Sequence, residues 1–500
     1  MPVATKRLNP TSNAGSTKPS KLRRSRPRQK TSLVSLPHPL NVKPAGNALF
    51  SAGPNNRRTT LGALAILSDE LILHLLTAYD LDAYDLARLS CVSSGLRAFA
   101  NLEATWRSLF VATTSEQGGR MNEFLGSWKR TVAQHLVEAE QGSKGKGKAG
   151  PLATVYPESP FYSDLLYLPH RLSLVSLDQF LPAAETNPST PIPRVDANIA
   201  TDEFHKEWAS QHRPCILRRP AAGIPGLGMS MTQLAQKYGE RWIRAEAIKA
   251  KVKTYADYSA SCERHWATLE QAQKGQGDDE NRDEEEQEQK AESVPDSYDP
   301  NTVPDESPYY LFDSSIPSQF AKDGLWTVPR QLAECPSNIY QPNSNGSTDA
   351  GTHADLFSLL SASRPEYRWL IAGPARSGSG WHKDPNTTSA WNTPLSGRKL
   401  WLMLPPDTPP PGVYVSPDGA EVTAPLSLIE WFADFYEETK ALYGPARGGD
   451  GRLLEGICEE GETMYVPSGW WHAVVNLTES VAMTQNFVSL SELPVSTGGN

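Results

Sequence analysis

Cysteine is scarce in this sequence. The 500 residues contain five, and no two stand in a Cys-x-x-Cys pair. They are Cys91, Cys215, Cys262, Cys335 and Cys458. An odd number at wide spacing disfavours both a disulfide framework and a cysteine zinc site. This usage favours a reducing intracellular compartment.

Long apolar runs are also missing. No stretch approaches the roughly eighteen apolar residues of a membrane-spanning helix, and no apolar signal core follows the basic start. We therefore expect neither a membrane protein nor a secreted one. Charged residues make up 21% of the chain and the net charge is -9, so the chain is mildly acidic overall. Its length allows two or three domains.

Acidic residues are absent from the first sixty positions, where Pro, Ser, Asn, Lys and Arg dominate. Such a composition cannot bury enough apolar surface to fold, so residues 1–58 are predicted to be a disordered basic tail. The stretch KLRRSRPRQK, Lys21–Lys30, fits a nuclear import signal, a nucleic-acid tether or simply a solvated tail. We expect a nuclear protein, or otherwise a cytoplasmic one, with nucleic acid contacted through this tail only.

Leucines at helical spacing follow the tail and predict a small all-α domain over residues 59–112. The stretch LSDELILHLLTAYDLDAYDLARLSCVSSGLRAFANLEATWRSLF resembles an F-box, although Ser68 stands where that family usually has proline. The resemblance implies docking to the Skp1-like adaptor of a cullin ubiquitin ligase. The alternative is an ordinary helical bundle packed on a catalytic domain.

The rest of the chain divides into two parts. Residues 113–160 are predicted to be a helical linker region, and residues 161–490 to be the main domain. The aromatic stretch 161–180 looks β-prone. A polar, acidic insertion over 263–305 is predicted to be a disordered loop, with binding of a basic partner as the less favoured interpretation.

Two histidines and an aspartate in the main domain offer a set of metal ligands. His382 and Asp384 are two positions apart, and residues i and i+2 of a strand share a face. His472 precedes the β-prone run AVVNL. Two imidazoles and one carboxylate form the facial triad of non-haem Fe(II) oxygenases. We predict that these three hold one Fe(II), although each histidine alone is more often structural.

Lys399 opens the apolar run KLWLML, which two prolines close. Burying an ammonium group at the start of an apolar strand is costly unless it meets an anion. A carboxylate of 2-oxoglutarate would be such an anion, so Lys399 is predicted to anchor this cosubstrate. Many short strands, with ligands on neighbouring ones, predict an all-β double-stranded β-helix (the jelly roll or cupin architecture) with flanking helices such as Leu428–Tyr443.

The segments RWLIAGPARSGSGWHKDPNTTSAWNTPLSGRKLWLMLPP and GETMYVPSGWWHAVVNLTESVAMTQNFVS resemble a JmjC domain, most closely that of the phosphatidylserine-receptor-type protein hydroxylases. The resemblance implies that Fe(II), 2-oxoglutarate and O2 are used. It also implies that Thr484 binds the cosubstrate with Lys399, that Asn392 and Tyr310 help, and that Ser379 lines the site. Trp381 is bulkier than the aliphatic residue expected there, which predicts a narrowed substrate mouth.

Three functions remain open at this point. The first is a dioxygenase that hydroxylates a protein side chain, of the lysyl hydroxylase type, or demethylates histone lysine or arginine; a histone or an RNA-associated protein would be its substrate. The second is a substrate adaptor that uses the F-box for a ligase and the barrel for recognition. The third is a metal-binding cupin without 2-oxoglutarate, which Lys399 and Thr484 disfavour.

Overall fold

The structure is a computed structural model. It describes residues 38, 40–49, 56–78, 81–116, 120–121, 124–141, 160–181, 190–274, 305–333, 355–416, 422–424, 427–445 and 449–489. The basic stretch Lys21–Lys30 and the acidic block within 275–304 lie outside these residues. Among the described residues, no single helix is long and apolar enough to cross a membrane; only the bent pair Arg57–Ile66 and Asp69–Thr77 meets that criterion together.

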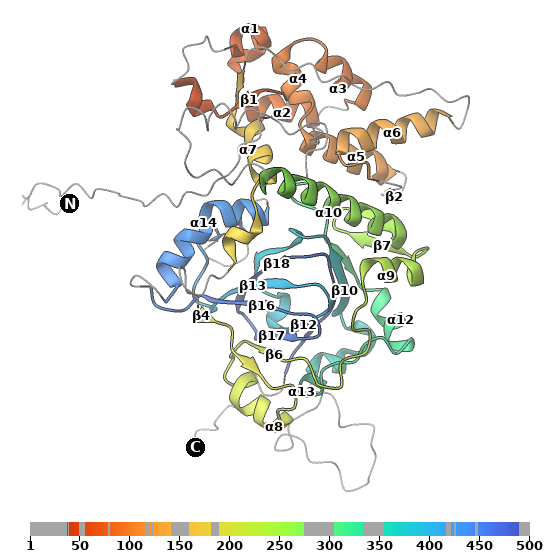
Figure 1. Cartoon of the computed structure of the whole chain (residues 1–500), viewed down its shortest axis with the longest axis vertical. Coiled ribbons are helices and arrows are strands. Elements are labelled where there is room, and N and C mark those ends of the chain that lie inside the picture. The colour runs from red at the N-terminus through yellow and green to blue at the C-terminus, as the bar shows by residue number, and fades with distance from the viewer. Residues whose placement is uncertain are drawn as a thin grey trace, which may run out of the picture. The chain divides into compact units, whose positions relative to one another are not determined.

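Two sheets form the centre of the main domain (Figure 1). Antiparallel pairing joins β10-β19-β12-β17 in the major sheet and β11-β18-β13-β16 in the minor sheet. These strands are β10 (Arg368–Gly373), β11 (Gly378–His382), β12 (Ser389–Ser396), β13 (Lys399–Leu404), β16 (Leu454–Cys458), β17 (Thr463–Val466), β18 (Trp471–Asn476) and β19 (Ser480–Phe487). The chain alternates between the sheets except from β13 to β16, which pair within the minor sheet, and this is the predicted jelly roll.

Shorter strands extend both sheets at their edges. The major sheet runs β2-β8-β7-β9 on one side of β10 and ends in β6-β5 beyond β17, while β4 extends the minor sheet beyond β16. These strands are β2 (Arg120–Met121), β4 (Thr190–Pro191), β5 (Arg194–Val195), β6 (Cys215–Leu217), β7 (Trp242–Ala245), β8 (Ile248–Lys251) and β9 (Leu311–Asp313). The strand β2 therefore comes from the expected linker region 113–160 and pairs with β8.

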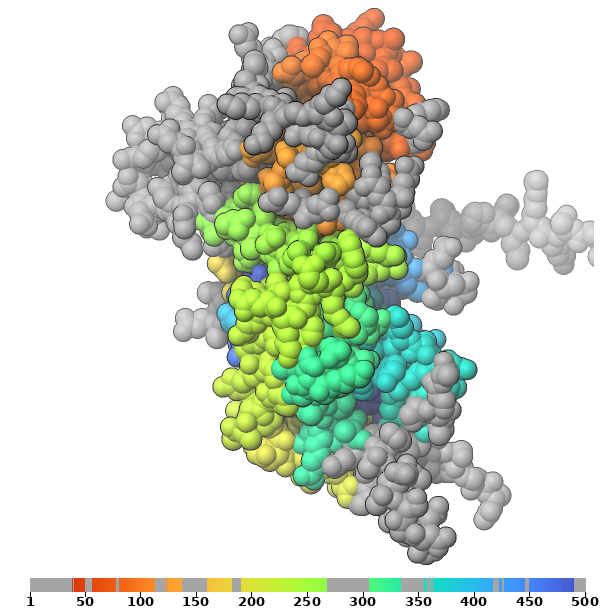
Figure 2. All heavy atoms as spheres, turned by 90° about the vertical axis from the view of Figure 1, so that its right-hand side faces the viewer, coloured from red at the N-terminus to blue at the C-terminus, as the bar shows by residue number. Residues whose placement is uncertain are grey.

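Helices cover the sheets. The predicted helix α14 (Leu428–Tyr443) begins at Ser427, whose hydroxyl accepts the N–H of Glu430. Its aromatic face packs with the alternate leucines of β13 in one apolar cluster. Elsewhere the main domain has α8 (Thr201–Phe204), α9 (Met231–Tyr238), α10 (Val252–Lys274), α12 (Ile316–Lys322) and α13 (Arg330–Ala333). Figure 2 shows residues 190–274 and 305–333, yellow to green, as one continuous face.

The part before the main domain is mainly helical in the residues that the structure describes. Its helices are α1 (Arg57–Leu61), α2 (Asp69–Ala78), α3 (Ala83–Ser90), α4 (Ser94–Ala100), α5 (Glu103–Glu116) and α6 (Trp128–Gln141). Asp82 and Asp85 form a capping box at the start of α3, and Ser93 caps α4. Their apolar residues join those around β7 and α10 in one continuous core. These helices, named here the helical unit, thus pack on the main domain.

Two predictions on this part of the chain are wrong. Residues 164–173, in the stretch that looked β-prone, form α7 (Asp164–Ser173), which Ser163 caps through the N–H of Leu166. The predicted insertion was to begin at residue 263, but α10 continues to Lys274. In that last part, Glu263 accepts the N–H of Ala375, shortly before β11, so this part of the helix has contacts that composition alone does not indicate.

Candidate metal centre and cosubstrate pocket

His382, Asp384 and His472 meet at the end of β11. Register pairs His382 directly with His472 of β18, and their ring centroids are 4.2 Å apart. Asp384 follows two residues later, with its Oδ2 atom 4.0 Å from Nε2 of His472. One potential ligand atom from each of the three lies within 4.8 Å of the others. Adjacent strands thus bring together side chains that are far apart in the sequence.

Hydrogen bonds fix the orientation of both rings. Nδ1 of His382 lies 2.7 Å from the carbonyl oxygen of Gly380, and Nδ1 of His472 lies 3.1 Å from that of Trp470. Each Nδ1 must carry the proton to donate to a carbonyl, which leaves the Nε2 lone pair for a metal. Burial, and then the nearby His382, lower the pKa of His472 to about 4. His472 is therefore neutral at physiological pH, as a ligand must be.

The donor set fits a divalent transition metal. Oδ2 of Asp384 is buried and has no hydrogen-bond partner among the described residues, so its desolvation is uncompensated unless a cation binds. Two neutral imidazoles and one carboxylate suit Fe(II) and leave further coordination positions for other ligands.

Lys399 is fully buried at the start of β13. Its Nζ donates to the hydroxyl oxygen of Tyr310 at 2.9 Å and to Oδ1 of Asn476 at 2.6 Å. Burial lowers the pKa of Lys399 to about 7. In the part of the chain that the structure describes, no carboxylate pairs with it. The ammonium group is therefore held by neutral partners alone, and an anion would compensate its desolvation.

Asn476 is a site residue that the sequence reasoning missed. It lies in β18 directly opposite Lys399, and its Nδ2 donates to the carbonyl oxygen of Gly373 at 3.2 Å and to Oγ of Ser377 at 3.0 Å. These contacts turn its Oδ1 toward Lys399. A signal was present, because Asn476 is four residues after His472 and so shares its face of the strand. Its complete burial also argues against glycosylation of the Asn-Leu-Thr sequon.

The other expected cosubstrate residues come from both sheets. Tyr310 precedes β9 and contacts Lys399 directly. Asn392 and Thr484 are register partners in the major sheet, and both are buried. Oδ1 of Asn392 has no hydrogen-bond partner within the described residues, whereas the Thr484 hydroxyl donates to the carbonyl oxygen of Trp391 at 2.8 Å. The Tyr310 hydroxyl can therefore still donate a hydrogen bond, and Oδ1 of Asn392 can still accept one. The hydroxyl proton of Thr484 is already used in its bond to Trp391.

Ser379 and Trp381 lie on the metal-binding strand β11. Register pairs Ser379 with Val474, two residues from His472 on the same face of β18, which places Ser379 on the site side. Trp381 is buried and packs against Trp431 of α14, with ring centroids 5.2 Å apart. The prediction that Trp381 narrows a substrate mouth is therefore wrong, because its ring fills the apolar layer under α14.

Comparison with known proteins identifies the family. The sequence profile of the cupin-like domain matches residues 201–492, more than half of the chain. The chain belongs to the cupin-like JmjC oxygenases. The jelly-roll fold and the resemblance to the phosphatidylserine-receptor type are both confirmed.

Named relatives of this JmjC oxygenase include demethylases and a hydroxylase. Arginine-specific demethylase JMJ22 of Arabidopsis thaliana is 32% identical over 458 residues, which cover 90% of this chain and 74% of that protein. Bifunctional arginine demethylase and lysyl-hydroxylase psr-1 of Caenorhabditis briggsae is 31% identical, covering 60% of this chain and 63% of its own length. Human 2-oxoglutarate and iron-dependent oxygenase JMJD4 is 33% identical over a stretch that covers 25% of this chain and 27% of that protein.

Proposed function

We propose that this chain is an Fe(II)- and 2-oxoglutarate-dependent dioxygenase that oxidises a C–H bond in an amino-acid side chain of a protein substrate, with lysyl hydroxylation as the first choice. The observation that carries the proposal is the pairing of a His-Asp-His cluster with a buried lysine that has no anionic partner among the described residues. An adaptor or a plain metal-binding cupin has no need of both.

Each residue has a separate task. His382, Asp384 and His472 would hold Fe(II), and the iron with 2-oxoglutarate supplies the activation of O2 for insertion into a C–H bond. Lys399 would bind the far carboxylate of 2-oxoglutarate. Tyr310 would donate its hydroxyl proton to the same carboxylate, since its oxygen already accepts from Lys399.

Burial of the pocket makes these contacts strong. Lys399, Asn476 and Asn392 are almost inaccessible to solvent, so the cosubstrate carboxylate would not compete with water for them. Hydrogen bonds to charged groups contribute about 1.5–3 kcal/mol each. The chain thus supplies orientation and exclusion of water, and the bound cofactors supply the redox chemistry.

Demethylation is the other outcome that this chemistry allows. Insertion of oxygen into an N-methyl C–H bond gives a hydroxymethyl amine, which releases formaldehyde and leaves the demethylated nitrogen. The relatives JMJ22 and psr-1 are named for arginine demethylation and psr-1 also for lysyl hydroxylation, which supports both outcomes for one fold. A histone or an RNA-associated protein is the proposed class of substrate.

Anaerobic reconstitution with Fe(II), followed by measured 2-oxoglutarate turnover, tests the proposal. We expect turnover by the wild type and almost none by His382→Ala or Lys399→Ala. Equal turnover in all three would rule out the oxygenase. Mass spectrometry of lysine and methyl-arginine peptides then separates the outcomes, since hydroxylation adds one oxygen atom and demethylation removes one methylene.

The helical unit supports a second candidate function, that of an F-box-like docking module. Several of its large apolar side chains are exposed, with 89% of Ile66, 67% of Val92 and 51% of Leu71 accessible. These side chains would be available to a partner, and a contiguous patch of them would be a binding surface. We propose a Skp1-like adaptor as that partner, and with it assembly into a ubiquitin ligase.

Co-purification with a Skp1-like protein tests this docking. We expect complex formation by the full chain and its loss in Leu71→Asp combined with Val92→Asp. A complex that persists in this double variant, or in a chain lacking residues 59–112, would remove the assignment. Nuclear localisation through Lys21–Lys30 is likewise a proposal, and unchanged nuclear signal after deletion of this stretch would reject it.

A further inference from the structure

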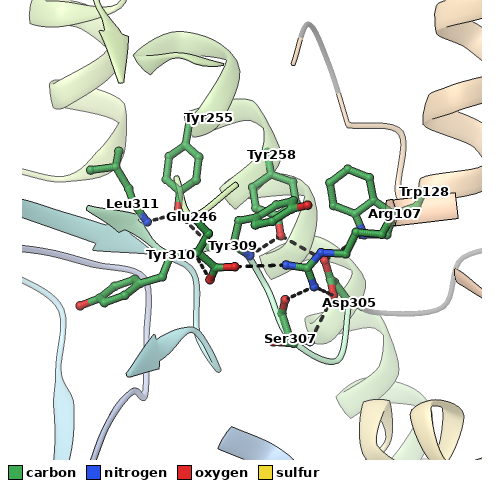
Figure 3. A network of polar contacts seen from close by, with 10 residues as sticks. All are labelled: Arg107, Trp128, Glu246, Tyr255, Tyr258, Asp305, Ser307, Tyr309, Tyr310 and Leu311. Carbon is green, nitrogen blue, oxygen red and sulfur yellow. Dashed lines mark hydrogen bonds and ion pairs between the residues drawn. The ribbon is translucent and has the colours of Figure 1, made fainter. Parts of the chain in front are cut away.

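An arginine of the helical unit reaches the segment that carries Tyr310 (Figure 3). Arg107 lies in α5, and its Nη1 donates to the carbonyl oxygen of Ser307 at 2.8 Å. Its Nη2 lies 3.5 Å from Oε2 of Glu246. The other oxygen of that carboxylate, Oε1, accepts the backbone N–H of Tyr310 at 3.1 Å. Arg107 is thus two contacts away from the residue that holds Lys399.

Two tyrosines of α10 hold the positions on either side of Tyr310. The hydroxyl of Tyr258 accepts the N–H of Tyr309 at 2.8 Å, and that of Tyr255 accepts the N–H of Leu311 at 3.1 Å. The N–H of Tyr310 itself bonds to Glu246. Among these three positions, Tyr310 is the one whose N–H bonds to a carboxylate, which Figure 3 shows between Arg107 and the Tyr310 backbone.

Glu246 adopts a strained backbone conformation. It is the first residue of the two-residue turn between β7 and β8, and its φ is +48°, in the left-handed region that non-glycine residues rarely adopt. Such a conformation is unfavourable for a residue with a side chain and persists where the surroundings fix it. At this turn the side chain of Glu246 contacts Arg107 and the backbone N–H of Tyr310, and these contacts help to fix its conformation.

The charge of Arg107 is secured at the same place. Burial works to lower its pKa, but Asp305, whose Oδ1 lies 3.9 Å from Nη1, and the nearby Tyr309 and Tyr258 together outweigh this and raise the pKa above its usual value. The guanidinium carbon also lies 3.9 Å from the ring centroid of Tyr309, a cation–π distance. Arg107 is thus a fixed cation between the helical unit and the segment 305–311.

We propose that Arg107 is a positioning residue for the 2-oxoglutarate site. Through Glu246 and the Ser307 carbonyl it fixes the main chain at Tyr310, and so the hydroxyl that accepts from Lys399 and would face the cosubstrate. The helical unit then contributes to cosubstrate affinity without touching the cosubstrate. This inference rests on the proposed function only for the identity of the ligand.

The expected effect is moderate, because Glu246 and Arg107 are partly exposed and water screens their attraction. We expect Arg107→Gln to weaken 2-oxoglutarate binding about three- to tenfold, the range for loss of a partly screened charged hydrogen bond. Mn(II) affinity should change less than about twofold, because no metal ligand takes part in the network.

Titration calorimetry of 2-oxoglutarate into the full-length, Mn(II)-loaded protein measures this effect. Arg88→Gln is the matched control, because Arg88 is an exposed arginine of the same helical unit whose ion pair with Asp85 stays within α3. We expect Arg88→Gln to bind like the wild type. Glu246→Gln should weaken binding to an extent similar to Arg107→Gln, and it provides the same test should Arg107→Gln fail to fold.

A Tyr310→Phe background separates positioning from general stability. In Tyr310→Phe the hydroxyl that Arg107 is proposed to position is missing. Arg107→Gln should therefore weaken 2-oxoglutarate binding less than about twofold in this background. Wild-type affinity in folded Arg107→Gln, or an equal loss in both backgrounds, overturns the inference. Failure of the wild type itself to bind 2-oxoglutarate contradicts the proposed function instead, so the two failures are distinguishable.

Discussion

Nζ of Lys399 lies 2.6 Å from Oδ1 of Asn476, its register partner on the neighbouring strand. The amide provides a hydrogen-bond acceptor but no negative charge. When protonated, Lys399 therefore carries an unbalanced positive charge in a buried site, and this charge selects for an anionic ligand.

Replacing the Asn476 amide by a carboxylate should weaken 2-oxoglutarate binding. In Asn476→Asp an isosteric carboxylate would pair with Lys399 and take the place of the ligand's charge. We expect 2-oxoglutarate affinity to fall by more than about tenfold, since a buried ion pair is costly to separate. Calorimetry measures the affinity. Wild-type affinity in Asn476→Asp would contradict the role given to Lys399.

The lowered pKa of Lys399 predicts proton uptake on binding. Above a pKa of about 7 the free protein carries a neutral amine, which must gain a proton to bind a carboxylate. Apparent affinity should therefore fall by about tenfold per pH unit above this pKa. Calorimetry at about pH 8 in buffers of different ionisation enthalpy should detect nearly one proton taken up. Lys399→Met should show neither effect, and binding independent of pH would argue against a titrating ammonium group.

The same pKa predicts how ligand-free stability depends on pH. Unfolding returns Lys399 to its ordinary pKa of 10.5, so between about 7 and 10.5 the unfolded chain binds more protons than the folded one. The contribution of this group to the free energy of unfolding therefore rises with pH in that window. Comparing denaturation of the wild type and Lys399→Met across this window isolates the contribution; identical slopes would contradict it.

Metal binding should stabilise the folded chain. A ligand at one hundred times its Kd adds about 2.7 kcal/mol to the free energy of unfolding. We expect Mn(II) to raise the melting temperature of the wild type and to have no such effect on His382→Ala. His74→Ala, which removes an exposed histidine of α2, should keep the full shift. A shift retained by His382→Ala would remove this histidine from the ligand set.

Trp381 should affect stability rather than the site. Because its ring is buried against Trp431, Trp381→Phe should lower the free energy of unfolding by about 1–2 kcal/mol, as expected for a smaller core side chain. Mn(II) and 2-oxoglutarate affinities should stay within about twofold of the wild type. A change in peptide preference without loss of stability would instead support a place at the substrate mouth.

The core of the site could be predicted because its signals are local. The His-x-Asp spacing and a lysine at the start of an apolar strand each indicate a face and a chemistry, and β13 and α14 have the predicted bounds. That the two histidines, the aspartate and Lys399 lie close together depends on strand register, which the sequence indicated only through the resemblance. Asn476 was missed since an amide within a strand carries no chemical signal until its partner across the sheet is known.

Other features depended on tertiary contacts. The segment of α7 contains aromatic residues and Pro169, and it is helical because Ser163 caps it and its apolar side packs in the core. Trp381 packs under α14, which lies far along the sequence, so its place in the core could not be read from its neighbours. The Arg107–Glu246 contact joins residues from two different parts of the protein, and no spacing rule connects them.

Short strands at the sheet edges set a practical boundary for shortening the protein. β2, β4 and β5 all precede residue 201, where the cupin-like match begins, and they cover the backbone of β8, β16 and β6. Expression from residue 201 onward would leave three unpaired edges open to intermolecular strand pairing. A recombinant fragment of the catalytic fold should therefore begin before Arg120. A shorter fragment that aggregates would show no activity, and this loss would be wrongly attributed to the active site.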